Sequence, residues 1–153
     1  MKEELAINIK RLGKEEVSQF IALIGLFESV LEMIAFSIPS TNHHKRLLSR
    51  DDFIVFVAEL DGQIVGGLTT YVIEQYYSEK PLAYVYDLAV DDTLQRQGIG
   101  KKLIAETNKF YKERGFEEVY VEAEKADRQA VNFYRKTLPS GEEDVAYFHY
   151  KLN

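Results

Sequence analysis

The sequence has no cysteine among its 153 residues. Disulfide bonds, thiolate metal sites and a cysteine nucleophile are therefore excluded, and a reducing environment is allowed. The N-terminus lacks the apolar segment of a signal peptide. The longest apolar run, around Phe53 to Ala58, is far too short to span a bilayer. The sequence therefore predicts a cytoplasmic protein that has no membrane partner.

Positive charge is also scarce, because 19 Lys and Arg residues stand against 25 Asp and Glu residues, for a net charge of −6. An acidic chain repels nucleic acid at long range and attracts cationic small molecules. We therefore expect no nucleic-acid partner. No repeat, low-complexity tract or linker interrupts the sequence, and a chain of this length predicts a single domain over residues 1–153.

Hydrophobic periodicity predicts strands that alternate with helices. The expected strands are 5–12, 53–60, 63–74, 83–90, 117–123 and 145–152, and the expected helices are 17–31, 41–49, 98–114 and 127–137. Asp61-Gly62 is typical of a tight hairpin between two antiparallel strands. Interleaved helices together with a hairpin predict an α/β (α+β) fold, in which helices cover both faces of a mixed sheet.

A glycine-rich segment follows the strand 83–90 and opens the next helix. Backbone N–H groups at such a helix start suit phosphate oxygens. Two nucleotide motifs are incomplete here. A P-loop needs Ser or Thr after Gly-Lys, where this chain has Lys102, and a dinucleotide fingerprint needs a third glycine, where it has Leu103. The pattern that remains is Gln95-x-x-Gly98-x-Gly100.

This pattern, after a strand that ends at Val90, resembles the acetyl-CoA loop of the GNAT N-acetyltransferase superfamily. A second segment, Asp127-x-x-Ala130-x-x-Phe133-Tyr134, resembles the family's Asn-x-x-Ala-x-x-Phe-Tyr helix. The resemblance implies the GNAT fold, with a central mixed, mostly antiparallel sheet and helices on both faces. It also implies an acetyl-CoA-dependent N-acetyltransferase and a homodimer.

Within the superfamily, segments 84–90 and 96–99 look like those of type I aminoglycoside 3-N-acetyltransferases. That likeness implies an aminoglycoside acceptor, acetylated at the 3-amine, and antibiotic resistance. The sequence departs from the family at Tyr147 and His149, where a His and an Asp are usual. Another small amine, a polyamine or a protein N-terminus therefore stays open as acceptor. A non-catalytic acyl-CoA-binding module is a further alternative.

The chemistry of acetyl transfer suggests roles for single residues. An ammonium must lose its proton before it can attack, so we expect Asp87 to act as the base, directly or through a water, with Glu124 as second candidate. Tyr134 is the expected acid for the thiolate of CoA. Asp87 and Tyr134 also have an alternative interpretation as core residues. His43 and His44 are expected in a loop or at the surface, and no metal site is expected.

The residues expected to bind acetyl-CoA lie in the strand, the loop and the later helix: Leu88, Ala89, Val90, Gln95, Arg96, Gln97, Gly98, Ile99, Gly100, Lys101, Asp127, Ala130 and Phe133. The residues expected to bind the cationic acceptor are acids: Asp87, Glu124, Glu143 and Asp144. We expect the amine to attack directly in a ternary complex.

Overall fold

The structure is a computed structural model that describes residues 5–33 and 37–153. Residues 1–4, for which no signal peptide is expected, lie outside the described residues. The chain divides into two compact units, one ending at Glu122 and one beginning at Ala123. The single domain over residues 1–153 stays a prediction.

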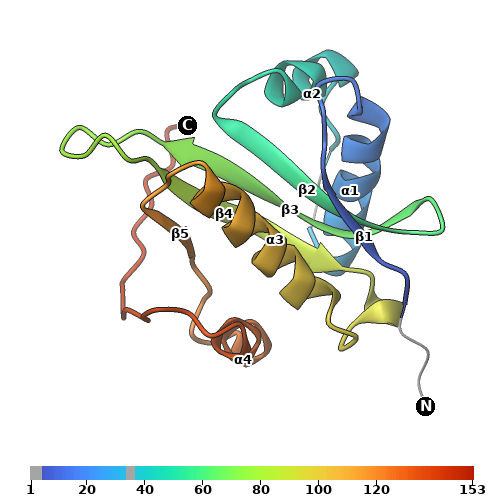
Figure 1. The fold of residues 1–153 in the computed structure, drawn as a ribbon. Helices are drawn as coiled ribbons and strands as arrows, with labels where there is room; N and C mark the ends of the chain where they lie inside the picture. Colours follow the sequence, from blue (N-terminus) through green and yellow to red (C-terminus); the bar gives the residue numbers. More distant parts are fainter. Residues whose placement is uncertain (1–4, 34–36) are drawn as a thin grey trace. The chain divides into compact units, whose positions relative to one another are not determined.

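The first unit contains a sheet and three α-helices (Figure 1). Its elements are β1 (Asn8–Arg11), α1 (Val17–Val30), α2 (Thr41–Leu48), β2 (Phe53–Leu60), β3 (Gln63–Ile73), β4 (Leu82–Val90), the 3-10 turn η1 (Asp92–Leu94), α3 (Ile99–Glu113) and β5 (Glu118–Val121). The second unit contains α4 (Arg128–Lys136).

The sheet has the strand order β1-β2-β3-β4-β5. The first three pairs of neighbouring strands are antiparallel, and the pair β4–β5 is parallel. Asp61 and Gly62 both have positive φ, 50° and 78°, as a two-residue hairpin turn between β2 and β3 requires. The predicted mixed, mostly antiparallel sheet and its hairpin are confirmed.

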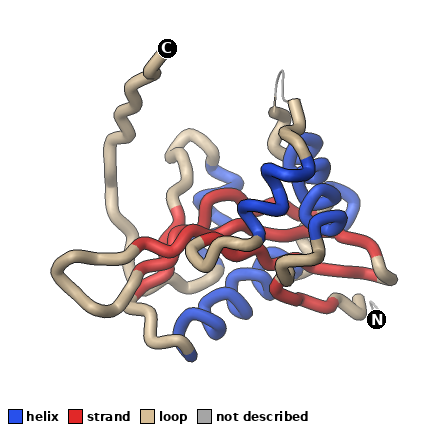
Figure 2. The backbone as a smooth tube through the Cα atoms, turned by 90° about the horizontal axis from the view of Figure 1, so that it is seen from above, coloured by secondary structure: helices blue, strands red, loops and turns tan. Residues whose placement is uncertain are grey.

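Helices cover both faces of this sheet (Figure 2), as the sequence predicts. On one face α1 packs against β3 and β4, and α2 packs against β2. Gly67 permits this approach, because an added Cβ would lie 2.6 Å from Leu23 Cδ1 and 2.7 Å from the Phe56 carbonyl oxygen. Leu23 is fully buried there, which contributes roughly 1.5–3 kcal/mol. On the opposite face α3 packs against the sheet through Ile99 and Leu103, both buried.

A β-bulge in β4 changes the direction of its side chains. The register pairs Thr70 with Val85 and Leu68 with Leu88, so that two residues of β4, Tyr86 and Asp87, oppose the single residue Thr69. In a regular strand consecutive side chains point to opposite faces. The extra residue places Tyr86 and Asp87 both on the face that α1 and α2 partly cover.

The sequence prediction is wrong for residues 145–152, which form no strand. A strand needs a hydrogen-bonded neighbour, and the described sheet consists of β1 to β5 alone. The prediction for helix α4 is confirmed, because the Asp127 carboxylate caps it by accepting the N–H of Ala130 at 3.1 Å. Ser40 caps α2 in the same way, by accepting the N–H of His43 at 3.2 Å.

Candidate active site

The second half of β4 has an open edge in the described part of the chain. Its pairing with β5 extends from Leu82 to Val85, yet β4 continues to Val90. Along residues 86–90 the side of β4 that would face β5 has no strand neighbour. Alternate backbone N–H and C=O groups of a strand point toward such an edge, where an extended ligand that contains amides can pair with them. Three residues expected to bind acetyl-CoA, Leu88, Ala89 and Val90, lie here.

The loop after β4 is braced by its own side chains. The Asp91 carboxylate accepts the N–H and the hydroxyl of Thr93, at 2.9 and 2.7 Å. The Gln95 side-chain amide donates to the carbonyl oxygen of Val90 and to the Asp92 carboxylate, both at 3.1 Å. Gln95 therefore holds the loop against the end of β4.

The loop leads into a helix N-terminus with free donors. Arg96 and Gly98 have φ of 64° and 83°, in the left-handed region. No side chain caps the helix at Gly98, and the first helical hydrogen bond that the structure records is from the N–H of Lys102 to the carbonyl oxygen of Gly98, at 3.0 Å. The N–H groups of residues 99–101 precede that bond. Together with the helix dipole, they form a site suited to an anion.

The loop's side chains divide into anchoring and exposed ones. Ile99 is 1% exposed and fixes the helix start to the sheet, whereas Arg96, Gln97 and Lys101 are exposed. An added Cβ at Gly98 would meet no atom within 4 Å. The glycine is therefore required by the left-handed backbone and not by packing within the protein.

Asp87 lies half-buried on the bulge. Its backbone N–H donates to Thr69 Oγ1 at 3.3 Å, and Thr69 is itself buried. Burial raises the pKa of the Asp87 carboxyl above its ordinary value. A carboxylate with a raised pKa is a stronger proton acceptor than an exposed one, which suits the role predicted for Asp87.

Two tyrosines that received no role in the sequence analysis lie beside Asp87. The rings of Tyr71 and Tyr86 are 5.7 Å apart between centroids and nearly perpendicular. Burial raises the pKa of the Tyr71 hydroxyl, and its electrostatic interactions with Tyr86 and Asp87 raise this pKa further. Arg50 and Asp52 form a bidentate ion pair at 2.7 Å. The charge of Arg50 lowers the pKa of Tyr71, and that of Asp52 raises it. The sequence analysis did not identify Tyr71 and Tyr86 as site residues, because the bulge that places Tyr86 and Asp87 on the face of Tyr71 cannot be seen in the sequence.

The other predicted site residues lie in the second unit: Glu124, Asp127, Ala130, Phe133, Tyr134, Glu143 and Asp144. Phe133 and Tyr134 are neighbours on α4, with ring centroids 4.9 Å apart. Asp144 forms an ion pair with Lys125 at 2.6 Å. Both side chains of this pair are exposed, so it contributes little to stability.

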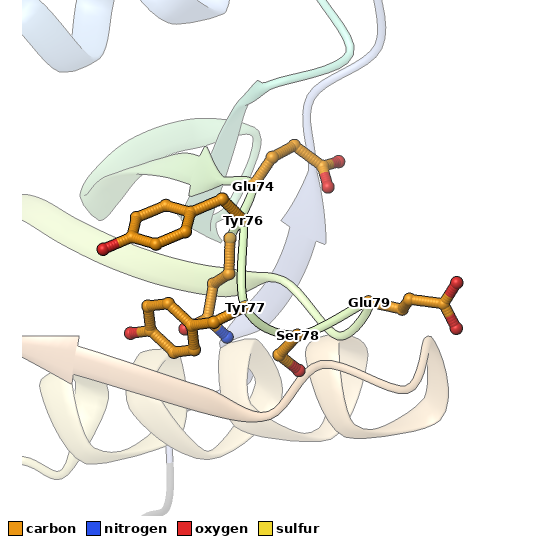
Figure 3. Close-up of a pocket in the computed structure, with 6 residues that line it drawn as sticks. Glu74, Tyr76, Tyr77, Ser78 and Glu79 are labelled. Atoms are coloured by element: carbon orange, nitrogen blue, oxygen red, sulfur yellow. The ribbon is translucent and has the colours of Figure 1, made fainter.

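An open depression lies on the connection between β3 and β4 (Figure 3). Tyr76 and Tyr77 line it, with 97% and 72% of their surface exposed and ring centroids 5.0 Å apart. The Gln75 side-chain amide donates to the Lys80 carbonyl oxygen at 2.7 Å and to Glu117 at 2.9 Å, which braces the connection. None of the predicted site residues lines this depression.

The histidines differ from the expectation at one position. His44 is 2% exposed, and its ring contacts Phe20 edge-on at 5.4 Å, so the expected surface position is wrong for this residue. Burial lowers the pKa of His44, which keeps the ring neutral in the core. Within residues 5–33 and 37–153, no cluster of three potential ligands could hold a metal ion. In those same ranges, no helix has both the length and the apolarity needed to cross a membrane.

Comparison with known proteins places this geometry in a family. Residues 23–138 match the family described as Acetyltransferase (GNAT) family. A solved aminoglycoside acetyltransferase from an uncultured soil metagenomic sample, in complex with trehalose, is 59% identical with a TM-score of 0.95, and the match covers 96% of this chain and 97% of that one. That acetyltransferase is also solved in complex with sisomicin. Another soil metagenomic aminoglycoside acetyltransferase is 28% identical with a TM-score of 0.91, over 97% of this chain and all of that one.

Among curated proteins, an N-alpha-acetyltransferase of Sulfurisphaera tokodaii is 34% identical over 88 residues, which are 53% of this chain and 53% of that protein. The match therefore spans about half the length of that curated relative. The chain belongs to the acetyltransferase (GNAT) family. This membership confirms the predicted fold and the predicted class of enzyme, and the family uses acetyl-CoA.

Proposed function

We propose that this protein transfers an acetyl group from acetyl-CoA to an amine of an aminoglycoside, by direct attack in a ternary complex. The observation that carries the proposal is the position of Asp87. It lies half-buried on the bulge of β4, with a raised pKa, within the open edge at residues 86–90 and on the strand that leads to the anion site at residues 99–101. The 59% identity to an aminoglycoside acetyltransferase supports the choice of acceptor.

The chain's own residues suit acetyl-CoA. The uncapped N–H groups of residues 99–101 and the left-handed backbone at Arg96 and Gly98 match a pyrophosphate. The open edge of β4 at Leu88–Val90 matches the amide-containing arm of the molecule. A backbone N–H near Leu88 would polarise the thioester carbonyl. When bound, acetyl-CoA supplies the activated acetyl group.

Proton transfer is assigned to side chains of both units. Asp87 accepts the proton of the acceptor ammonium, directly or through a water, with Glu124 as the second candidate base. The freed amine forms the new N–C bond as the C–S bond of the thioester breaks, and the nitrogen then loses a second proton, which restores the phenol of Tyr134 through solvent. Tyr134 donates its proton to the leaving thiolate. Glu143 and Asp144 bind the other ammonium groups of the acceptor.

The amine position and the assembly belong to the same proposal. The likeness of segments 84–90 and 96–99 to type I enzymes supports the 3-amine, and cytoplasmic acetylation of this amine would confer antibiotic resistance. We propose a homodimer and no metal requirement. A protein α-amine is the second candidate acceptor, favoured by the match to the Sulfurisphaera tokodaii N-alpha-acetyltransferase.

The test is an assay of CoA release with acetyl-CoA and a panel of amines that includes sisomicin, gentamicin, spermidine and short peptides. We expect release with the aminoglycosides and a loss of about 10²-fold or more in kcat for Asp87→Asn. Two-dimensional NMR of the product identifies the acetylated nitrogen. Release with peptides alone would favour the second candidate. Binding of acetyl-CoA without any release would overturn the enzyme proposal.

A further inference from the structure

A row of aromatic side chains crosses four strands of the sheet. The register pairs Phe53 of β2 with Tyr71 of β3, Tyr71 with Tyr84 of β4, and Tyr84 with Tyr120 of β5. The rings of Phe53 and Tyr71 are 5.1 Å apart between centroids, and those of Tyr84 and Tyr120 stack at 4.8 Å. Because directly paired residues point to the same face, the row lies on the face of α1 and α2.

The row passes from the core to solvent. Phe53 is 4% exposed, packed against Phe20 of α1 at 5.7 Å. Tyr71, the next ring, is 39% exposed. Tyr86 lies two residues after Tyr84 on the same strand, contacts the rings of both Tyr71 and Tyr84, and is 59% exposed. The helices therefore cover one end of the row and leave Tyr71 and Tyr86 open.

The bulge joins these open rings to the predicted base. Without the extra residue in β4, Tyr86 and Asp87 would point to opposite faces of the sheet. With it, the carboxylate of Asp87 lies at the margin of the aromatic surface, near Tyr71. The charge of Asp52, also near Tyr71, is balanced by its ion pair with Arg50. An aromatic face carries negative electrostatic potential, so rings and carboxylates favour the same kind of ligand, a cation.

We propose that Tyr71 and Tyr86 form a platform that binds the amino-substituted ring of the acceptor while its reacting ammonium lies at Asp87. Tyr86 is the residue that determines specificity. This inference rests on the proposed function, because it takes the acceptor to be a cyclic polyamine. The C–H groups of an alicyclic ring pack on the aromatic faces, and its ammonium groups interact with their negative potential. A peptide N-terminus offers one ammonium and no such ring, so the platform favours aminocyclitols.

The test compares Tyr86→Leu, which removes the aromatic ring, with Tyr86→Phe, which keeps it. Tyr76→Leu is the matched control, because Tyr76 is 97% exposed and its ring pairs with Tyr77 on the β3–β4 connection. For Tyr86→Leu we expect KM for gentamicin to rise about 3- to 30-fold, with kcat and KM for acetyl-CoA within about twofold of wild type. Tyr86→Phe and Tyr76→Leu stay close to wild type.

Direct calorimetric titration of gentamicin into the full chain separates this inference from the proposed function. One outcome would be that wild type binds gentamicin more tightly than Tyr86→Leu does but does not acetylate it. In that case the proposed function fails and the platform stands. If wild type acetylates gentamicin and Tyr86→Leu leaves both KM and the dissociation constant unchanged, the platform is overturned. An equal loss in Tyr76→Leu, or no binding by wild type, also overturns it. Thermal unfolding verifies that each variant is folded.

Discussion

Replacing Thr69 by Val tests whether the bulge holds Asp87 in place. Thr69 is 5% exposed, and its Oγ1 accepts the backbone N–H of Asp87 at 3.3 Å. Valine has nearly the same shape and cannot accept a hydrogen bond, so the N–H would lose its partner. A buried donor without a partner costs about 1–3 kcal/mol. Because this hydrogen bond is long and only partly buried, we expect about 1 kcal/mol, which for a chain of this length lowers Tm by about 2–4 °C.

The same change should affect catalysis more than stability. A base displaced by about 1 Å can lose about 10²-fold in rate, and without the hydrogen bond the backbone of Asp87 is less well fixed. For Thr69→Val we expect kcat to fall at least about tenfold. KM for acetyl-CoA should change less, because the proposed anion site at residues 99–101 lies beyond the bulge. Thr69→Ser keeps the acceptor oxygen and should restore most of kcat. Thermal unfolding and steady-state kinetics measure both effects. A Val variant that unfolds and turns over like wild type would show that the hydroxyl does not support the bulge.

The remaining predictions concern the base, the acid and the two glycines. Burial raises the pKa of Asp87 above the ordinary aspartate value of about 3.9, so kcat/KM should rise with pH through that raised pKa. The Asp87→Asn variant should lose this rise. An unchanged pH profile in the variant would exclude Asp87 as the base. Tyr134→Phe should lower kcat and leave the calorimetric affinity for acetyl-CoA unchanged; a full rate would exclude Tyr134 as the acid. Gly67→Ala should lower the free energy of unfolding by at least about 3 kcal/mol, because its Cβ would overlap Leu23 and backbone. Gly98→Ala should lower the free energy of unfolding by only about 1–2 kcal/mol, because its Cβ meets open space and only the left-handed φ is strained. Urea unfolding measures both glycine variants. Equal losses of stability would contradict this interpretation.

The sequence predicts most of the fold because its signals are local. The hairpin at Asp61-Gly62 depends on two neighbouring residues, and its prediction is confirmed. The caps that the structure shows at Ser40 and Asp127 are equally local. The prediction of a strand at 145–152 is wrong. Alternating apolar residues indicate that a segment can form a strand, but they do not supply the neighbouring strand with which it must pair.

The candidate site is predicted less completely than the fold, for a related reason. The loop Gln95–Gly100 is contiguous, so its pattern alone located an anion site. Outside β4, the surroundings of Asp87 come from β3, which supplies Thr69 and Tyr71. Tyr71 in turn lies near the Arg50–Asp52 pair, which precedes β2. They come together only through strand register, and the bulge reverses the direction of side chains in the middle of β4. The sequence around Tyr86 and Asp87 contains no local pattern that predicts the bulge, and so it does not show that the two side chains share one face.

The raised pKa of Asp87 links the stability of the protein to its chemistry. A carboxyl whose pKa is higher in the folded than in the unfolded chain stabilises the fold fully below the unfolded value, about 3.9, and this contribution is lost as pH rises through the folded value. Above the folded value the site therefore holds a buried carboxylate that opposes folding. An ammonium at the same place replaces the lost hydration with a charge partner. A cationic acceptor should then bind more tightly as pH rises through the pKa of Asp87, until the amine itself loses its proton. In the proposed mechanism, the same burial that raises the proton affinity of Asp87 also strengthens its interaction with the acceptor ammonium.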